Sequence, residues 1–411
     1  MTAQQVRAGA HPLFDPLDQA TLADPYPAYR RLRDEDPVAY LPDYDMWMVT
    51  RYEDATRVAR DPAAFSSKIG MSPDFERREG PSTGVNYRIG GPKVRVLIAT
   101  DPPEHQVFRR AVAKAFSPGS VGALKQRIAE IARDRVGALL DHRADGTSDF
   151  FSTVAEPAPV SVLAELLGVP EHMHERFRGW STVITTDLDQ VDGLPDGVGR
   201  GMDMFRYFSN QLRNAGAGER PTLFDAIGSA GEAGVSTHEL LAFCAFLLVA
   251  GIETTTNLLT NLMGALLRFP DVQQRLREHP ELIPGAVDEA IRYDTPVQAL
   301  WRGTTGPVRL GERDLPADAR VLVVWGSANR DERKFPRPDL FVPERSPNEH
   351  VGFGAGPHYC LGARLAVAEV TAVLSELLAR TSRIEPAGEP TRTHSLVLRG
   401  MTDLPVRAVP R

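Results

Sequence analysis

Cysteine is scarce in this chain, which carries only Cys244 and Cys360 among its 411 residues. Two cysteines cannot build the disulfide framework that stabilises many small secreted domains. Their scarcity is typical of proteins in a reducing compartment. We therefore expect a cytoplasmic protein.

Long apolar runs are also missing. The longest, from Leu240 to Ile252, is shorter than the roughly 20 residues that a helix needs to cross a bilayer. Residues 1–16 contain no signal-like apolar stretch and read as a flexible arm, so no membrane anchor is expected. The net charge is -7 and the basic residues are scattered, which argues against a nucleic-acid partner.

Composition gives few further constraints. The chain is 42% hydrophobic and 25% charged, as in ordinary globular proteins. Its length would allow one large domain or two to three smaller ones. No internal repeat and no shift in composition marks a boundary between domains.

One cysteine stands in an unusual stretch, Phe353 to Ala363. Gly354 and Gly356 permit backbone angles that other residues resist, so this loop can present Cys360 at close quarters. The run from Leu361 to Leu378 has helical apolar spacing, which places Cys360 at a helix N-terminus and favours its thiolate. A thiolate there predicts a nucleophile or a metal ligand; the simpler alternative is a buried structural cysteine.

A long helix is predicted for residues 236–268, beginning with the capping box Ser236-Thr237-His238-Glu239. Its middle, Ala250 to Thr256, contains a glycine, an acid and three threonines, which are unfavourable in an apolar helix. This indicates a local distortion kept for function. Alternatively, the segment is a weak helix whose threonine hydroxyls bond to carbonyls four residues earlier. Cys244 reads as a small core residue.

Two further helices carry paired polar residues. A helix beginning near Asp101 places His105 and Arg109 on one face, and a helix from Pro284 to Pro296 carries Glu289 and Arg292. Taken alone, each pair more simply indicates a solvated surface than a site. Further helices are expected at 28–34, 53–60, 121–141, 152–167, 171–185 and 202–214, strands at 44–51, 308–310 and 320–325, a long loop at 66–99, a break at 187–201 and an irregular segment at 327–349.

The pattern Phe353-Gly354-x-Gly356-x-His358-x-Cys360-Leu361-Gly362 resembles the haem-binding loop of the cytochrome P-450 monooxygenases, soluble bacterial members above all. The order of the other motifs along nearly the whole chain is similar too. The resemblance implies a mostly α fold in one domain, residues 17–411, with helices around a buried haem and a small β-rich corner. This expectation replaces the estimate from length.

The resemblance also implies a role for each matching position. Cys360 would be the axial thiolate of the iron in haem b, and Gly251 would leave room for dioxygen. Glu253 and Thr254 would deliver protons during dioxygen activation. The haem propionates would be held by His105, Arg109, Arg302 and His358. A structural ion triad would consist of Glu289, Arg292 and Arg345.

The implied reaction inserts one atom of dioxygen into an organic substrate. Electrons would come from a ferredoxin and its reductase, docking on a basic patch of Arg109, Arg110, Lys114 and Arg364. The substrate is expected to be a small hydrophobic molecule, such as a natural-product intermediate or an aromatic compound. By family position, the 66–99 loop, residues 177–190 and a set of apolar side chains would line its pocket: Phe243, Phe246, Leu247, Ala250, Val297, Leu300 and Val397.

Two other classes of function remain open at this point. The chain could be a peroxide-dependent haem-thiolate oxygenase, or a member that rearranges its substrate without activating oxygen. Alternatively, it could be a non-enzymatic haem binder, such as a sensor or an electron carrier. The intact Glu253–Thr254 pair argues against the first class, because peroxide users of this family commonly lack it. The apolar pocket lining and the long loops argue against the second class.

Overall fold

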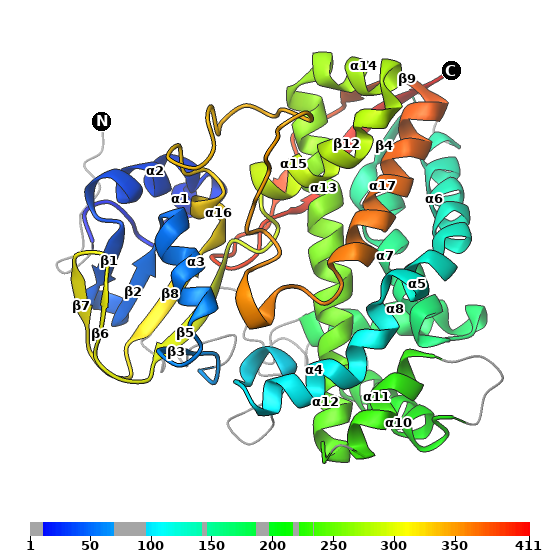
Figure 1. Cartoon of the computed structure of the whole chain (residues 1–411). Coiled ribbons are helices and arrows are strands. Elements are labelled where there is room, and N and C mark those ends of the chain that lie inside the picture. Colours follow the sequence, from blue (N-terminus) through cyan, green and yellow to red (C-terminus); the bar gives the residue numbers. More distant parts are fainter. Residues whose placement is uncertain (1–10, 70–95, 142–145, 186–196, 217–221, 233) are drawn as a thin grey trace.

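One helix runs through the middle of the molecule from Thr237 to Arg268, a length of 32 residues (Figure 1). It has three consecutive parts: α12 (Thr237–Leu248), a π-helical turn η6 (Val249–Glu253) and α13 (Thr254–Arg268). The computed structural model describes residues 11–69, 96–141, 146–185, 197–216, 222–232 and 234–411.

The start of this helix confirms the predicted capping box. The backbone N–H of Glu239 donates to Ser236 Oγ at 3.3 Å, and the N–H of Ser236 donates to Glu239 Oε2 at 2.8 Å. Two N–H groups that a helix leaves unpaired are thereby satisfied. The helix ends before Pro270, which cannot continue the hydrogen-bond ladder.

The predicted distortion in this helix is confirmed by η6. A π-helical turn places one extra residue in the helix and is frequent at functional sites. The alternative prediction, that threonine hydroxyls bond to carbonyls four residues earlier, also holds in part, because Thr254 Oγ1 donates to the carbonyl of Ala250 at 2.6 Å. A Cβ on Gly251 would lie 3.2 Å from Leu163 Cδ2, so the glycine allows η6 to approach a neighbouring helix closely.

Length and composition alone would allow this helix to cross a membrane. Its most apolar 18-residue window has a mean hydropathy of 1.5, and 67% of that window is buried inside the protein. Such burial is what the central helix of a packed core shows. Cys244 on this helix is fully buried, and burial raises the pKa of its thiol to about 12, as expected for a core residue.

The other helices pack around it, mostly on the right of Figure 1. Their bounds are α1 (Gln19–Ala23), α2 (Tyr26–Glu35), α3 (Tyr52–Arg60), α4 (Glu104–Ala113), α5 (Pro118–Ala123), α6 (Lys125–Leu140), α7 (Pro157–Leu167), α8 (His174–Thr185), α10 (Gly197–Arg213), α11 (Leu223–Glu232), α14 (Pro270–Glu278), α15 (Ile283–Tyr293), α16 (Trp325–Ala328) and α17 (Ala363–Arg380). A second π-helical turn, η4, spans Phe151–Ala155. Short 3-10 turns occur at Pro42–Tyr44, Leu97–Ala99, Lys114–Phe116, Glu171–Met173, Pro280–Leu282 and Gly356–His358.

The strands gather mainly on the left of Figure 1 in a five-stranded sheet of order β1-β2-β8-β5-β3. Its strands are β1 (Val38–Leu41), β2 (Met46–Val49), β3 (Phe65–Ser66), β5 (Ala299–Thr304) and β8 (Arg320–Val324). Only β2 and β8 run parallel; the other pairs in this sheet are antiparallel. The resulting β-rich corner beside a helical body agrees with the expected fold.

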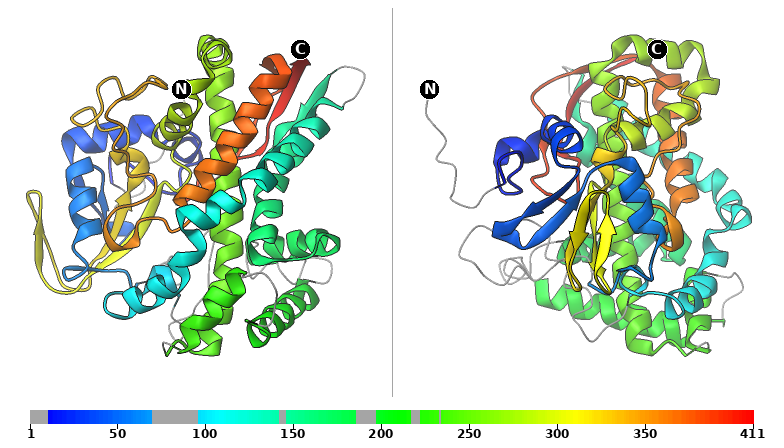
Figure 2. Two further views of the ribbon diagram at one scale, coloured as in Figure 1. Left: turned by 45° about the vertical axis from the view of Figure 1, so that its right-hand side comes forward. Right: turned by 60° about the vertical axis from the view of Figure 1, so that its left-hand side comes forward.

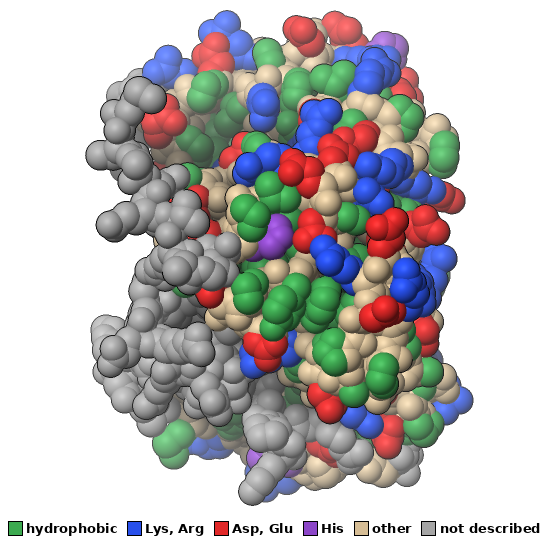
Figure 3. Space-filling model, turned by 90° about the vertical axis from the view of Figure 1, so that its left-hand side faces the viewer, with side chains coloured by type: hydrophobic (Ala, Val, Ile, Leu, Met, Phe, Trp, Pro, Cys, Tyr) green, Lys and Arg blue, Asp and Glu red, His purple; other side chains and the backbone are tan. Residues whose placement is uncertain are grey.

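Smaller sheets complete the fold. One is the hairpin of β6 (Val308–Leu310) and β7 (Arg313–Leu315), which projects from the strand-rich side (Figure 2). The others pair β10 (Thr391–Arg392) with β11 (Met401–Asp403), and β12 (Pro405–Pro410) with β4 (Thr147–Asp149) and β9 (Thr381–Pro386). On the strand-rich face, acidic and basic side chains are interspersed in the coloured part of Figure 3.

Most predicted elements are present with shifted ends, and two boundaries were wrong. The break predicted at 187–201 extended too far, because α10 already begins at Gly197. Buried Met204 and Phe208 pack this helix onto the core, and tertiary packing overrides the low helix propensity of its glycines. The irregular segment predicted from 327 is preceded by a short helix, α16, that reaches into it.

Parts of four predicted segments lie outside the described residues. These are residues 1–10 of the expected arm, 70–95 of the expected 66–99 loop, 186–190 of the expected pocket segment and 187–196 of the expected break. Within the described remainder of the arm, Phe14 is 4% exposed and its ring stacks on Tyr29 with centroids 5.8 Å apart. The described ends of the loop form β3 and a 3-10 turn.

Candidate functional site

The loop that precedes α17 is folded tightly around Cys360. Gly354 and Gly356 adopt φ of 73° and 67°, a region that glycine accepts at little cost. A Cβ on Gly356 would lie 2.4 Å from the carbonyl oxygen of Ala59, so the loop packs directly on the backbone of α3. The N–H of Cys360 donates to the carbonyl of Phe353 at 2.8 Å and closes the loop.

Cys360 forms no disulfide bond and lies just before α17. From the position of Cys360 at a helix N-terminus we predicted a lowered thiol pKa, and this prediction was wrong for the chain alone. Burial raises the pKa of Cys360, and the backbone N–H groups of Gly362 and Ala363, together with Arg109, lower it only in part. A metal ion would therefore have to displace the proton from this thiol.

Two histidines meet beside this loop. His105 on α4 is 1% exposed, and its ring centroid lies 4.2 Å from that of His358. Within the described part of the chain, neither ring nitrogen of His105 has a hydrogen-bond partner, whereas His358 Nε2 lies 3.0 Å from Ser67 Oγ. Burial, then nearby Arg109, lowers the pKa of His105 to about 4. Burial, then Arg302, lowers the pKa of His358 to about 3.

Two arginines accompany the histidines. Arg109 Nη2 donates to the carbonyl of Tyr359 at 2.7 Å. Arg302 on β5 is 4% exposed and donates to the carbonyl of Trp301 at 2.6 Å; burial lowers its pKa to about 10. His105 and Arg109 thus share one face of α4, as predicted. We call His105, Arg109, Arg302 and His358 the basic cluster.

The basic cluster fits a haem carrying two carboxylates. Within the described residues, no carboxylate forms an ion pair with Arg109 or Arg302. The nearest acid in the sequence motif, Asp101, instead accepts from Ser66 Oγ at 2.5 Å and from the N–H of Ser67 at 2.8 Å. Buried polar nitrogens without partners are costly, and haem propionates would satisfy them.

The predicted ion triad is assembled beneath this loop. Glu289 and Arg292 have fully buried side chains, so the alternative of a solvated surface pair is wrong. Glu289 accepts from Arg292 Nε and Nη2 at 2.8 Å, and from Arg345 Nε at 3.0 Å. Arg292 and Arg345 also donate to backbone carbonyls between residues 329 and 340. The triad therefore holds the irregular segment that leads to the cysteine loop.

Part of the central helix exposes a stripe of side chains although it lies deep in the fold. Phe246, Ala250, Glu253 and Thr254 are half-buried, at the spacing of one helix face. Phe243 is 1% exposed, and its ring lies 4.8 Å from that of Phe108 on α4. Leu247 is likewise buried. Of the expected pocket residues on this helix, Phe246 and Ala250 are the partly accessible ones.

A second group of expected pocket residues lies at the strand-rich side. Val297, Leu300 and Val397 are each half-buried. They belong to two segments that are joined through the isolated bridge between Val297 and Leu398. The structure thus brings the segment of Val297 beside that of Val397, which is 100 positions later in the sequence.

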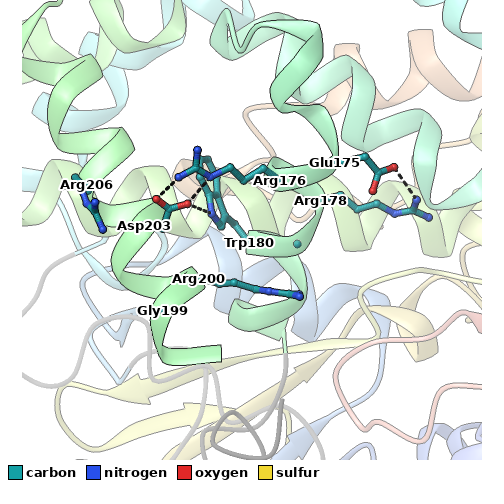
Figure 4. Close-up of a pocket in the computed structure, with 9 residues that line it drawn as sticks. Glu175, Arg176, Arg178, Trp180, Gly199, Arg200, Asp203 and Arg206 are labelled. Atoms are coloured by element: carbon teal, nitrogen blue, oxygen red, sulfur yellow. Dashed lines mark hydrogen bonds and ion pairs between the residues drawn. The ribbon is translucent and has the colours of Figure 1, made fainter. Parts of the chain in front are cut away.

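A cavity of about 770 Å³ lies elsewhere, between α8 and α10 (Figure 4). Its lining is charged: Arg176 pairs with Asp203, Arg178 pairs with Glu156, and Arg200 and Arg206 also face it. Arg178, Gly179 and Trp180, from the 177–190 segment expected at the pocket, border this cavity, but its charged walls do not suit a hydrophobic substrate. Of the 177–190 segment expected at the pocket, residues 186–190 lie outside the described residues.

Sequence reasoning missed some residues around the site. Ser67, which contacts His358, was hidden within the long loop, and no strand had been predicted beside it. Asp294 and Arg399 form a buried pair, which only long-range contacts reveal. Glu369 on α17 is 5% exposed and its Oε2 has no partner; an acid in an apolar helix face could have been noticed.

Comparisons with known proteins agree with this geometry. A family model described as cytochrome P450 matches residues 217–398. A beta-dihydromenaquinone-9 omega-hydroxylase of Mycobacterium tuberculosis is 34% identical over 404 residues, covering 97% of this chain and 79% of the relative. Cytochrome P450 107B1 of Saccharopolyspora erythraea is 35% identical over 410 residues, covering 95% and 96%.

Solved structures are similar over the same length. The crystal structure of CYP109E1 from Bacillus megaterium in complex with corticosterone superposes with a TM-score of 0.81 at 29% identity. The alignment covers 94% of this chain and 99% of that one.

Proposed function

The chain belongs to the cytochrome P450 family and is a monooxygenase of that family, and we propose that it oxidises a hydrophobic organic substrate with haem b, dioxygen and electrons from a ferredoxin and its reductase. The observation that supports this most strongly is the Cys360 loop beside the basic cluster. We further propose that the protein works in the cytoplasm.

Haem held by a thiolate supplies the activation of dioxygen, since the sulfur donates electron density that favours O–O cleavage. In our proposal, Cys360 binds the iron, and the N–H groups of Gly362 and Ala363 stabilise the charge on sulfur. His105, Arg109, Arg302 and His358 hold the two propionates. The buried triad around Glu289 keeps the loop in place and takes no part in the chemistry.

Thr254 and Glu253 are proposed to move protons to the reacting oxygen. Thr254 Oγ1 donates its proton to the carbonyl of Ala250, so its lone pairs can accept a hydrogen bond from water or bound oxygen. The π-helical turn is suited to this task, because it disturbs the regular hydrogen-bond ladder beside the hydroxyl. Glu253 is half-buried at the same turn and can exchange protons with solvent. Gly251 is proposed to leave room for dioxygen.

The substrate is proposed to lie between the two groups of half-buried apolar side chains. Phe246 and Ala250 form one side, and Val297, Leu300 and Val397 form the other. Of the three similar proteins reported above, one is named as a hydroxylase of a menaquinone derivative and one was crystallised with a steroid, and both ligands are large and hydrophobic. A hydrophobic substrate for this chain is consistent with both.

Electrons are proposed to enter at the cysteine side of the molecule. Arg110, Lys114 and Arg364 are exposed there, next to Arg109 and Tyr359. Basic groups on an acidic protein would attract an acidic carrier such as a ferredoxin. Charge reversal at Arg110 and Lys114 should slow reduction at low salt, and unchanged reduction would exclude this docking face.

The decisive test is the spectrum of the reduced, carbonyl-bound protein. Thiolate ligation gives a strongly red-shifted Soret band, and Cys360→Ala should abolish this band. A well-folded, haem-loaded wild type without the band would refute the proposal. Thr254→Ala should separate electron consumption from product formation; if it does not, the peroxide-dependent alternative regains support.

A further inference from the structure

A buried ion pair lies close to the strand-rich side of the proposed pocket. Asp294, which follows α15, accepts from Arg399 Nε at 2.6 Å and from Tyr26 Oη at 2.8 Å. Asp294 and Arg399 are 6% and 5% exposed. Burial alone would raise the pKa of Asp294, but Arg399 and Arg392 outweigh it and lower that pKa overall, so the pair is charged.

The two partners anchor two backbone segments at the point where these segments meet. Asp294 lies two residues before Pro296, whose carbonyl accepts from the N–H of Arg399 at 2.8 Å. The N–H of Gln298 donates to the carbonyl of Val397 at 2.7 Å, and Val297 forms the bridge with Leu398. We call residues 296–300 and 396–399 the clip.

The pairing of residues 296–298 with residues 397–399 is short, and short two-stranded contacts are marginal by themselves. Ala299 and Leu300 are held separately, because they belong to β5 and pair with β8. The ion pair reinforces the short pairing at its outer end. Arg399 Nη1 also donates to the carbonyls of Ala23 at 2.9 Å and Leu22 at 3.3 Å, which ties the clip to the N-terminal helices. Tyr26 completes the arrangement, since Gln298 Nε2 donates to its hydroxyl at 3.2 Å.

The clip carries the half-buried side chains of Val297, Leu300 and Val397. We propose that the Asp294–Arg399 pair, with Tyr26, is a positioning cluster that fixes this wall of the pocket and thereby determines which substrates fit. This inference rests on the proposed function, since it assigns these side chains to the substrate pocket.

A buried ion pair such as Asp294–Arg399 contributes more to fixing one arrangement of the chain than to the free energy of unfolding. Replacing a buried ion pair by apolar groups often costs little stability, while a charged pair with fixed hydrogen bonds can select one register between segments. A one-residue slip in the clip would break the bridge between Val297 and Leu398 and turn Val397 to the opposite face. The cluster is therefore placed to hold a register that the backbone contacts alone hold weakly.

The test compares two haem-binding azoles in the haem-loaded protein. Imidazole is small and reports access to the iron, whereas 4-phenylimidazole also fills the space against the wall. The Soret shift gives a dissociation constant for each azole, and each variant is described by the dissociation constant of 4-phenylimidazole divided by that of imidazole. In Arg399→Met we expect this ratio to change about tenfold, with the carbonyl-bound band unchanged.

Three matched variants separate positioning from other effects. Arg399→Lys keeps the charge and should restore part of the ratio. Arg392→Met removes a cation from the same aspartate, at 3.4 Å, without touching the clip, and should leave the ratio as in wild type. Tyr26→Phe removes one hydrogen bond and should change the ratio in the same direction as Arg399→Met, but less.

A ratio within twofold of wild type in folded Arg399→Met would overturn the inference, as would an equal change in Arg392→Met. If Arg399→Met does not fold, the result for Tyr26→Phe decides in the same way. Failure of the proposed function can be distinguished from failure of this inference, because in the first case the wild type itself would lack the thiolate-type band.

Discussion

The imidazole rings of His105 and His358 lie 4.2 Å apart, and neither nitrogen of His105 has a hydrogen-bond partner among the residues that the structure describes. Two bases in contact, next to two arginines, are poorly compatible with a positive charge on either ring. The arrangement becomes favourable when carboxylates are added, because each of these groups can then donate to an anion. The basic cluster is thus built for a ligand with negative charge.

This relationship predicts acid sensitivity of the haem-free protein. The pKa of His105 is lowered from 6.5 to about 4, so its neutral ring contributes stability above pH 6.5 that is lost as the pH falls toward 4. Urea unfolding of the haem-free protein at several pH values should show this loss, and His105→Phe should reduce it. Haem-loaded wild type serves as the control, since propionates would favour the protonated ring. Identical pH profiles for wild type and His105→Phe would contradict the prediction.

The ion triad predicts a large effect on stability. Glu289→Ala leaves Arg292 buried without its carboxylate, which should lower the free energy of unfolding by about 3–5 kcal/mol. Glu281→Ala is a suitable comparison, because its partner His279 is exposed and the change should be small. Urea unfolding measures both variants, and equal losses would show that burial of the triad is unimportant.

Glu369 predicts a pH effect of the opposite sign. Burial raises its pKa well above 4.5, so the folded state keeps the proton while the unfolded state releases it as the pH rises. The wild type should therefore lose stability between mildly acidic and alkaline pH. Glu369→Gln stays neutral and should lose less. Thermal midpoints at pH 5 and pH 8 test this, and a parallel decline in both proteins would be evidence against a buried, protonated carboxyl.

The cysteine loop offers a matched pair of glycines. Gly356→Ala places a Cβ 2.4 Å from the carbonyl oxygen of Ala59 and requires φ of 67°, so it should displace the loop from α3. Gly362→Ala meets no atom within 4 Å. Melting of the haem-free proteins should show a clear loss for Gly356→Ala, on the order of 2 kcal/mol or more, and little change for Gly362→Ala. A loop that tolerates both changes would not be packed as described.

Local patterns in the sequence predicted much of this site. The Ser236–Glu239 capping box, the distortion around Gly251 and the shared face of His105 and Arg109 all follow from residues within a few positions of one another. Short-range rules of capping and helical spacing are sufficient for such features. The roles of the matching residues came from the family resemblance.

Features that depend on burial or on distant contacts could not be predicted in this way. The pKa of Cys360 was predicted in the wrong direction, because the sequence shows the helix N-terminus and not the apolar surroundings of the sulfur. Asp294 and Arg399 are 105 positions apart, and no local pattern links them. The start of α10 depends on packing of Met204 and Phe208 rather than on its own glycines.

The parallel pairing of β2 with β8 has a consequence for how the molecule is made. Trp47 pairs with Val321, so two strands from opposite thirds of the chain must meet before the five-stranded sheet exists. Closing so large a loop is slow, because chain entropy opposes it until the contacts form. We expect the helical body to assemble first and the strand-rich corner to complete folding, leaving β1–β2 transiently without its neighbour.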